Sequence, residues 1–335
     1  MTVQGHGWDD NTGYPAFRNL IINGGMSVDQ RYANASRTIA DNEFAADRFR
    51  FQSNIGTWTS QCMTTDGPSG VTPNSIKITN SASPGSVVSG SYVLLHQYVE
   101  GVNLSNLGFG TAGARAIILS FYVKSSVTGT YSAAIRNNAV NRSYVGTYTI
   151  NAANTWERKS IAFVGDTSGT WLIDTGIGAR VTWALTAGST YETATPNTWL
   201  GVSALATSGS VDLVTTASAT WQVTGVQLEA GPVATPFEFE PFETTLRKCQ
   251  RYFYRHAPTG ITYMSFAYAG AQQRLVLPLP CPMRATANVS ASGWAGGTTP
   301  TTSAINSMLS TINFYHASGA YYIDTGTIID VNAEL

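Results

Sequence analysis

The feature that most constrains this fold is a series of short segments in which apolar and polar residues alternate. The clearest spans 116–124, where Ile117, Leu119, Phe121 and Val123 fall on one face and polar side chains lie between them. No long helical period interrupts these segments before residue 241. The pattern predicts an antiparallel β-sandwich of the jelly-roll type. Further strands are expected at 127–136, 143–150, 156–164, 179–186 and 198–206.

Two other segments carry local signals. Over 221–229, the apolar parity switches at Gly225, which predicts a β-bulge at that glycine. Residues 19–23 form a short apolar run that ends in an Asn-Gly turn signal, so we expect a strand there. In 44–51 the alternation places Phe49 and Phe51 on one side and arginines on the other.

The pattern changes once, after Pro241. A stripe at helical spacing predicts a helix over about 242–256, which could pack on its own domains or on copies of the chain. The stripe is formed by Phe242, Leu246, Cys249 and Phe253. Strand patterns return beyond Pro258, in a stretch of about 80 residues.

The expected fold class is therefore all-β: a jelly-roll β-sandwich, one linking helix and a smaller C-terminal β domain. The expected boundaries are an N-terminal arm over 1–18, the sandwich over 19–240, the helix over 241–257 and the C-terminal domain over 258–335. A domain as small as the last one gains stability from oligomerisation.

Charge is scarce in this chain. It has 19 Lys and Arg against 20 Asp and Glu, so the net charge is −1, and charged residues make up 12% of the total, against about 25% in an average protein. Nothing in this balance favours nucleic acid or an anionic membrane. The polar N-terminus lacks a signal-peptide pattern, and no apolar run is long enough to insert in a bilayer.

Catalytic motifs are missing from the sequence. There is no G-x-S-x-G elbow, no H-E-x-x-H and no glycine-rich phosphate loop. The cysteines, Cys62, Cys249 and Cys281, are widely spaced, so we expect free thiols rather than a zinc site or a disulfide framework. We expect a protein that is not an enzyme.

Binding of sugars without catalysis fits the composition better. Tryptophan faces can stack on sugar rings, although each tryptophan could equally belong to the core. The candidates for receptor or glycan contact are Trp58, Trp171, Trp183 and Trp294. No cofactor is expected beyond a structural Ca²⁺, for which Asn23, Asp47 and Glu229 are the candidate oxygen ligands.

Several runs of the sequence resemble bacteriophage tail-fibre and receptor-binding (spike) proteins with a carbohydrate-binding-module-like jelly-roll domain. The most specific is GVQLEAGPVATPFE at 225–238, followed by CQRYF at 249–253. The others are NLIINGGMSVDQR at 19–31, ADRF at 46–49, QYVEG at 97–101, LSFYVK at 119–124, NTWE at 154–157, GDTSGTW at 165–171, PMRA at 282–285 and NAEL at 332–335.

The resemblance implies a virion protein of the tail, assembled in the host cytoplasm, which forms a homotrimer. Its arm would attach to other tail or baseplate proteins, and its other end would bind a host-surface glycan or protein. Only about 18 residues precede the resembling part, which favours a short appendage. The alternatives are a purely structural adaptor or decoration protein of the virion, a glycan depolymerase and a secreted carbohydrate-binding module.

Overall fold

The computed structural model describes residues 18–82, 86–257, 262–265, 272–292, 301–304, 309–315, 320–323 and 328–335. The chain divides into two compact units, one reaching Phe242 and the other running from Glu243 to Leu335. The larger unit is a β-sandwich of the jelly-roll type, as the alternation predicts, and each unit is described by itself below.

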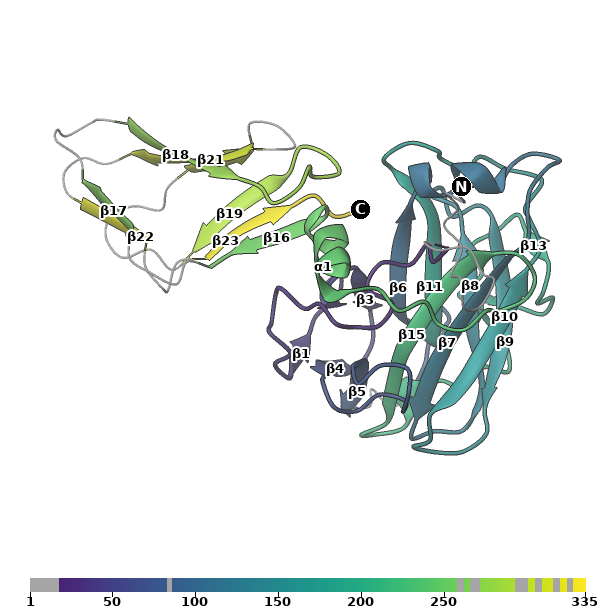
Figure 1. The fold of residues 1–335 in the computed structure, drawn as a ribbon. Helices are drawn as coiled ribbons and strands as arrows, with labels where there is room; N and C mark the ends of the chain where they lie inside the picture. The colour runs from purple at the N-terminus through teal and green to yellow at the C-terminus, as the bar shows by residue number, and fades with distance from the viewer. Residues whose placement is uncertain are drawn as a thin grey trace, which may run out of the picture. The chain divides into compact units, whose positions relative to one another are not determined.

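One layer of the sandwich is a six-stranded sheet (Figure 1). Its pairs are all antiparallel. In spatial order the strands are β1 (Arg37–Ile39), β4 (Thr57–Met63), β5 (Ser75–Ala82), β15 (Thr220–Ala230), β7 (Ile117–Ser125) and β10 (Glu157–Phe163).

The other layer is a seven-stranded sheet, again antiparallel throughout. In spatial order the strands are β13 (Trp199–Leu200), β9 (Ser143–Ile150), β8 (Gly129–Arg136), β11 (Ile177–Ala187), β6 (Tyr92–Glu100), β3 (Phe49–Ser53) and β2 (Phe44–Ala46). β8 with β9 and β2 with β3 are consecutive hairpin strands, whereas β11, β6 and β3 are far apart in sequence because the chain crosses between the layers.

The core lies between the inner faces of these two sheets. The four apolar residues of β7 that share a parity are buried there, as the alternation predicts, and so are Phe49 and Phe51. Trp183 of β11 meets Phe121 of β7 edge-on, with ring centroids 5.7 Å apart. Aromatic contacts across the layers add to the hydrophobic gain from burial.

A long connection covers part of the outer face of the seven-stranded sheet. It contains a 3₁₀ turn (Ser189–Tyr191) and two short parallel strands, β12 (Glu192–Thr193) and β14 (Ala206–Thr207). Leu205 and Ala206 pack on Leu94 of β6 and Ala184 of β11. We expected one strand over 198–206. That prediction is wrong, because residues 201–205 leave the sheet to form this cover.

The bulge predicted at Gly225 is present. The register between β15 and β7 shifts between Thr224 and Gln227, and Gly225 has a φ of +58°. A Cβ at this position would lie 2.9 Å from the ring of Tyr122. The extra residue keeps Val223 and Val226 both in the core, although their parities differ.

Residues 19–23 do not form the expected strand, but the expected Asn-Gly turn is present at 22–25. Asn23 has a φ of +62°, and its Oδ1 accepts the backbone N–H groups of Ser27 and Val28. These bonds close a compact loop in place of a sheet ladder. Three further 3₁₀ turns lie in this unit, at Gly101–Asn103, Ser105–Leu107 and Leu213–Thr215.

The C-terminal unit begins within the first turn of α1 (Phe242–Gln250) and continues in strands. The helix is shorter than the expected 242–256, because residues 253–256 pair with β23 as β16. The strands are β16 (Phe253–His256), β17 (Thr262–Ser265), β18 (Gln272–Pro278), β19 (Asn288–Ser292), β20 (Thr301–Ala304), β21 (Leu309–Tyr315), β22 (Ala320–Ile323) and β23 (Ile328–Asn332). Among the described residues of this unit, these strands form three sheets: β16-β23-β19, β17-β22 and β18-β21-β20.

All three cysteines are free, and two of them, Cys62 and Cys249, are buried. Burial raises the pKa of the Cys62 thiol, which keeps it protonated. The prediction of free thiols is confirmed. Of the helices in the described ranges, α1 is the longest at nine residues, and none is long and apolar enough to cross a membrane.

Candidate functional site

Two rows of polar side chains cross the outer face of the seven-stranded sheet. In the first row the register aligns Arg50 of β3, His96 of β6 and Thr182 of β11. In the second it aligns Tyr98 of β6, Arg180 of β11 and Arg136 of β8. Members of the two rows on one strand are two residues apart, so they point to the same side of the sheet. We call these six residues the basic face.

The three arginines of the basic face bond only to neutral groups within the described part of the chain. Arg136 is 7% exposed, and its guanidinium donates to Ser203 Oγ at 3.2 Å and Thr182 Oγ1 at 3.4 Å. Arg180 donates to the backbone and side-chain oxygens of Asn138, and Arg50 donates to Asn42 Oδ1.

The Nε of each of these arginines is buried and has no hydrogen-bond partner there. Glu100 lies two residues beyond Tyr98 on β6 and makes contacts of its own. The basic face therefore concentrates positive charge without a carboxylate partner among the described residues.

His96 lies at the centre of this charge. Its side chain is fully buried, and neither ring nitrogen has a hydrogen-bond partner in the described structure. Burial lowers the pKa of His96 well below its usual value, and Arg136, Arg50 and Arg180 lower it further. His96 is therefore neutral at pH 7, with one ring nitrogen as a donor and the other as an acceptor.

Tyr98 is stacked between charged and aromatic neighbours. The His96 and Tyr98 rings are stacked with centroids 4.7 Å apart, and the Arg180 guanidinium carbon lies 4.6 Å from the Tyr98 centroid. Burial and the nearby Arg180 lower the pKa of Arg136 to about 10. Arg136 remains charged at neutral pH, so the basic face is suited to bind an anionic or hydroxyl-rich ligand.

The described tryptophan candidates serve the core instead. Trp58 is 1% exposed and Trp183 is 0% exposed, so neither can stack on a ligand in this structure. Trp171 is 8% exposed, packs edge-on against Phe109 and Trp199, and donates its Nε1–H toward Asp166. The prediction of these three as binding platforms is wrong, because each contributes a large apolar surface to packing. Trp294 lies outside the described residues.

The three calcium candidates already have protein partners. Asn23 donates to the backbone oxygen of Asp47, and its Oδ1 accepts two N–H groups. The Asp47 carboxylate accepts from Gln30 and pairs with Arg31 at 3.3 Å. Across the described ranges, no group of three or more His, Cys, Asp or Glu residues could hold a metal. The structure therefore does not support a calcium site made of Asn23, Asp47 and Glu229.

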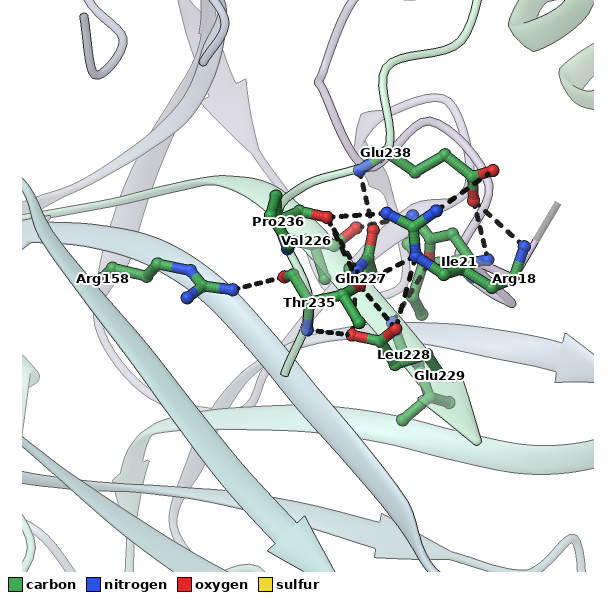
Figure 2. A network of polar contacts seen from close by, with 11 residues as sticks. Arg18, Ile21, Arg158, Val226, Gln227, Leu228, Glu229, Thr235, Pro236 and Glu238 are labelled. Atoms are coloured by element: carbon green, nitrogen blue, oxygen red, sulfur yellow. Dashed lines mark hydrogen bonds and ion pairs between the residues drawn. The ribbon is translucent and has the colours of Figure 1, made fainter. Parts of the chain in front are cut away.

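Glu229 belongs to a separate polar network, shown in Figure 2. Its Oε1 accepts the N–H of Thr235 at 2.9 Å, and its Oε2 lies 3.4 Å from Arg18 Nε. Arg18 also reaches Glu238, whose Oε2 accepts the Arg18 backbone N–H. The network ties residues 18–19 to β15 and to the segment that follows it.

The four residues of the helical stripe differ in burial. Cys249 and Phe253 are buried, Leu246 is half-buried and Phe242 is 52% exposed. Phe253 sits in β16 rather than in the helix. A role for this stripe between copies of the chain stays a prediction.

A hollow of about 480 Å³ lies on the sandwich unit away from the basic face. Tyr122, Arg158, Phe237 and Phe239 are among its lining residues, and Phe239 is 79% exposed. None of the lining residues has a buried polar atom without a partner. The hollow therefore offers aromatic surface but lacks the unpaired polar groups that distinguish the basic face.

Sequence reasoning missed the basic face. Its signal was present in each strand, since Arg50, His96, Arg136 and Arg180 each stand at the outward parity beside buried apolar residues. Alternation shows which face of a strand a residue lies on, but it does not show that β3, β6, β11 and β8 become neighbours in the sheet.

Comparisons with known proteins give resemblances of fold only. No family profile and no curated protein sequence matches the chain. Among solved structures, an enzymatically active domain of the bacteriophage CBA120 tailspike protein 4 shares 12% identity, with a TM-score of 0.32 over 64% of this chain. The chain covers 21% of that tailspike chain.

Two carbohydrate-binding structures are similar to a comparable extent. The family 11 carbohydrate-binding module from Clostridium thermocellum, in complex with a mixed-linked tetrasaccharide, is 14% identical; 61% of this chain and 99% of that chain are covered, with a TM-score of 0.30. The N-terminal cellulose-binding domain of Cellulomonas fimi β-1,4-glucanase C is 13% identical, with 53% and 90% covered and a TM-score of 0.27.

Proposed function

We propose that this chain is a non-catalytic host-binding component of a bacteriophage tail, and that its sandwich binds a surface glycan at the basic face. The observation that carries the binding role is the set of buried polar atoms without partners around His96. Leaving a buried donor or acceptor unpaired costs about 1–3 kcal/mol. A ligand that supplied the missing hydrogen bonds would remove this cost.

The assignment to a phage tail rests on the sequence runs that resemble tail-fibre proteins, above all residues 225–238. A trimeric assembly and attachment to the virion through the N-terminal arm belong to the same proposal. Adhesion to a host surface needs a binding surface and no catalytic group, and the basic face offers arginines, a neutral histidine and a tyrosine. A pair of carboxylates across a cleft, which glycoside hydrolysis requires, is not part of it.

Binding of the purified full-length chain to host cells and to an array of glycans would test the proposal. We expect saturable binding that is competed by soluble surface polysaccharide, and light scattering on the same sample should give the mass of a trimer. The variant Arg180→Gln should weaken binding by tenfold or more. As a matched control, Arg115→Gln removes an exposed charge outside the basic face and should leave binding unchanged.

Two results would contradict the proposal in different ways. A folded protein that binds no cells and no glycans would indicate a purely structural adaptor. Release of reducing sugars from the polysaccharide would indicate a depolymerase instead.

A further inference from the structure

The charge balance of the basic face differs from that of the rest of the chain. Several other cations of the described structure meet carboxylates: Arg142 pairs with Asp166 at 2.6 Å and Arg255 with Asp330 at 2.6 Å. Arg50, Arg136 and Arg180 are three of only 19 Lys and Arg residues, yet they gather around one histidine. In a chain with so few charged residues, three positive charges lie together without a carboxylate partner among the described residues.

This arrangement is unfavourable without a ligand. Arg180 and Arg136 lie directly opposite each other on paired strands, where like charges repel. Arg136 is also almost completely buried, and a buried charge without a counterion carries a desolvation penalty. An anion at this position would offset both effects at once.

The hydrogen-bond donors and acceptors of the basic face fit a ligand that has more polar groups than a simple anion. Guanidinium groups donate only, and their planar fork matches the two oxygens of a carboxylate. Neutral His96 offers one donor and one acceptor, and Thr182 adds a hydroxyl beside it. Hydroxyl groups of a sugar need both donors and acceptors, so the two kinds of group fit one ligand that carries an acid and several hydroxyls.

We propose that the basic face selects an acidic glycan, whose anionic substituent lies between Arg136 and Arg180. His96 and Thr182 are fully buried in the structure described, so the ring hydroxyls bond to them when the half-buried side chains of Arg50 and Arg180 move aside. This inference rests on the proposed glycan-binding function and adds the substrate class. Uronic acids, nonulosonic acids and sulfated sugars share the required chemistry, and the experiment separates them.

The test is an array in which each acidic oligosaccharide stands beside a neutral form of itself. Uronic and nonulosonic acids are paired with their methyl esters, and sulfated sugars with their desulfated forms. We expect binding to at least one acidic member to exceed its neutral partner by tenfold or more. Isothermal titration of that pair should then show the same difference in solution.

Variants locate the effect. Arg180→Gln and Arg50→Gln should each reduce affinity for the acidic member by tenfold or more and leave its neutral partner nearly unaffected. Arg115→Gln should change neither. Circular dichroism checks that each variant is folded, and Arg136→Lys keeps the charge while removing the planar fork, so it should lose affinity for carboxylates most clearly.

The outcomes distinguish the inference from the function on which it rests. Equal binding of acidic and neutral partners would overturn the inference and leave glycan binding standing. Failure to bind any glycan would overturn both. A loss in Arg115→Gln equal to that in Arg180→Gln would show general charge attraction and would also overturn the inference.

Discussion

The charged side chains on the two outer faces of the sandwich differ in their bonding partners. On the six-stranded sheet the carboxylates meet cations: Asp66 pairs with Lys124, and Glu229 with Arg18. On the seven-stranded sheet the arginines of the basic face have only neutral partners among the described residues. Paired charges hold loops and termini in place, whereas the unpaired ones are available for a ligand. The contrast therefore separates a structural surface from a binding surface in the same domain.

The largest effect should come from the core beneath the basic face. Trp183 lies on β11 between Thr182 and Ala184 but points to the opposite side, where it is fully buried. Trp183→Ala should lower the free energy of unfolding by about 3–5 kcal/mol, because it leaves a large cavity. Urea unfolding followed by fluorescence measures this. A loss below about 1 kcal/mol would contradict the assignment of Trp183 to the core.

The second effect tests the paired face. Glu229→Ala removes one partner of a nearly buried ion pair and leaves the Thr235 N–H without its acceptor, while Arg18 keeps its contact with Glu238. We expect a loss of about 3 kcal/mol in unfolding free energy. Glu229→Gln keeps one oxygen acceptor and should lose less. If both variants were as stable as the parent protein, the polar network would not stabilise the sandwich.

The third effect is a dependence on pH that only the basic face should show. Because the pKa of His96 is lowered in the folded protein, the unfolded chain binds its proton more readily as the pH falls below about 6.5. Stability should fall with pH in that range, at a slope of at most about 1.4 kcal/mol per pH unit. The loss should end once the pH is below the folded pKa.

The groups that face His96 are Arg50 on β3, Thr182 and Arg180 on β11, Arg136 on β8 and Tyr98 on its own strand. Of the side-chain types present there, only histidine ordinarily changes its charge between pH 5 and 8. His96→Gln should therefore remove the slope between pH 6.5 and 5, as measured by thermal unfolding at several pH values. An unchanged slope in that variant would assign the effect to another group.

The smallest effect compares one cation from each face. Arg180→Gln loses a cation–π contact of about 0.5–1 kcal/mol with Tyr98 but relieves repulsion with Arg136, so stability should change little. Lys124→Gln loses its ion pair with Asp66 and should be destabilised by up to about 1 kcal/mol. Thermal unfolding of the two variants side by side would show the difference. A larger loss for Arg180→Gln would reverse the contrast.

The alternation in the sequence predicted the layers but not their order. Ile117, Leu119, Phe121 and Val123 are inward as expected, and the bulge at Gly225 follows from a parity change visible in the sequence. The strand pairs that build the basic face, β3 with β6, β6 with β11 and β11 with β8, join residues 40 or more apart in sequence. For this reason the basic face could not be predicted, although each of its residues stands at an outward position.

The tryptophans show a different limit. Trp183 has Val181 and Leu185 two residues away on either side, and all three are buried. That spacing already favoured a core position over a surface platform. The interpretation of these tryptophans as sugar-stacking residues relied on the number of tryptophans in the chain and not on their inward position in the strand alternation. The expected helix was too long for a related reason, since Phe253 also fits the strand alternation of β16.

The network around Arg18 has a mechanical consequence. Arg18 contacts Glu238 (Figure 2). Asn19 also bonds to Glu238, and Leu20 bonds to Leu228, so the described chain enters and leaves the sandwich at adjacent points. Tension applied between residue 18 and residue 238 would act on these few bonds first and would bypass the two sheets. Under tension, the bonds of residues 18–20 with Leu228 and Glu238 would then break first, while the core and the basic face stayed folded.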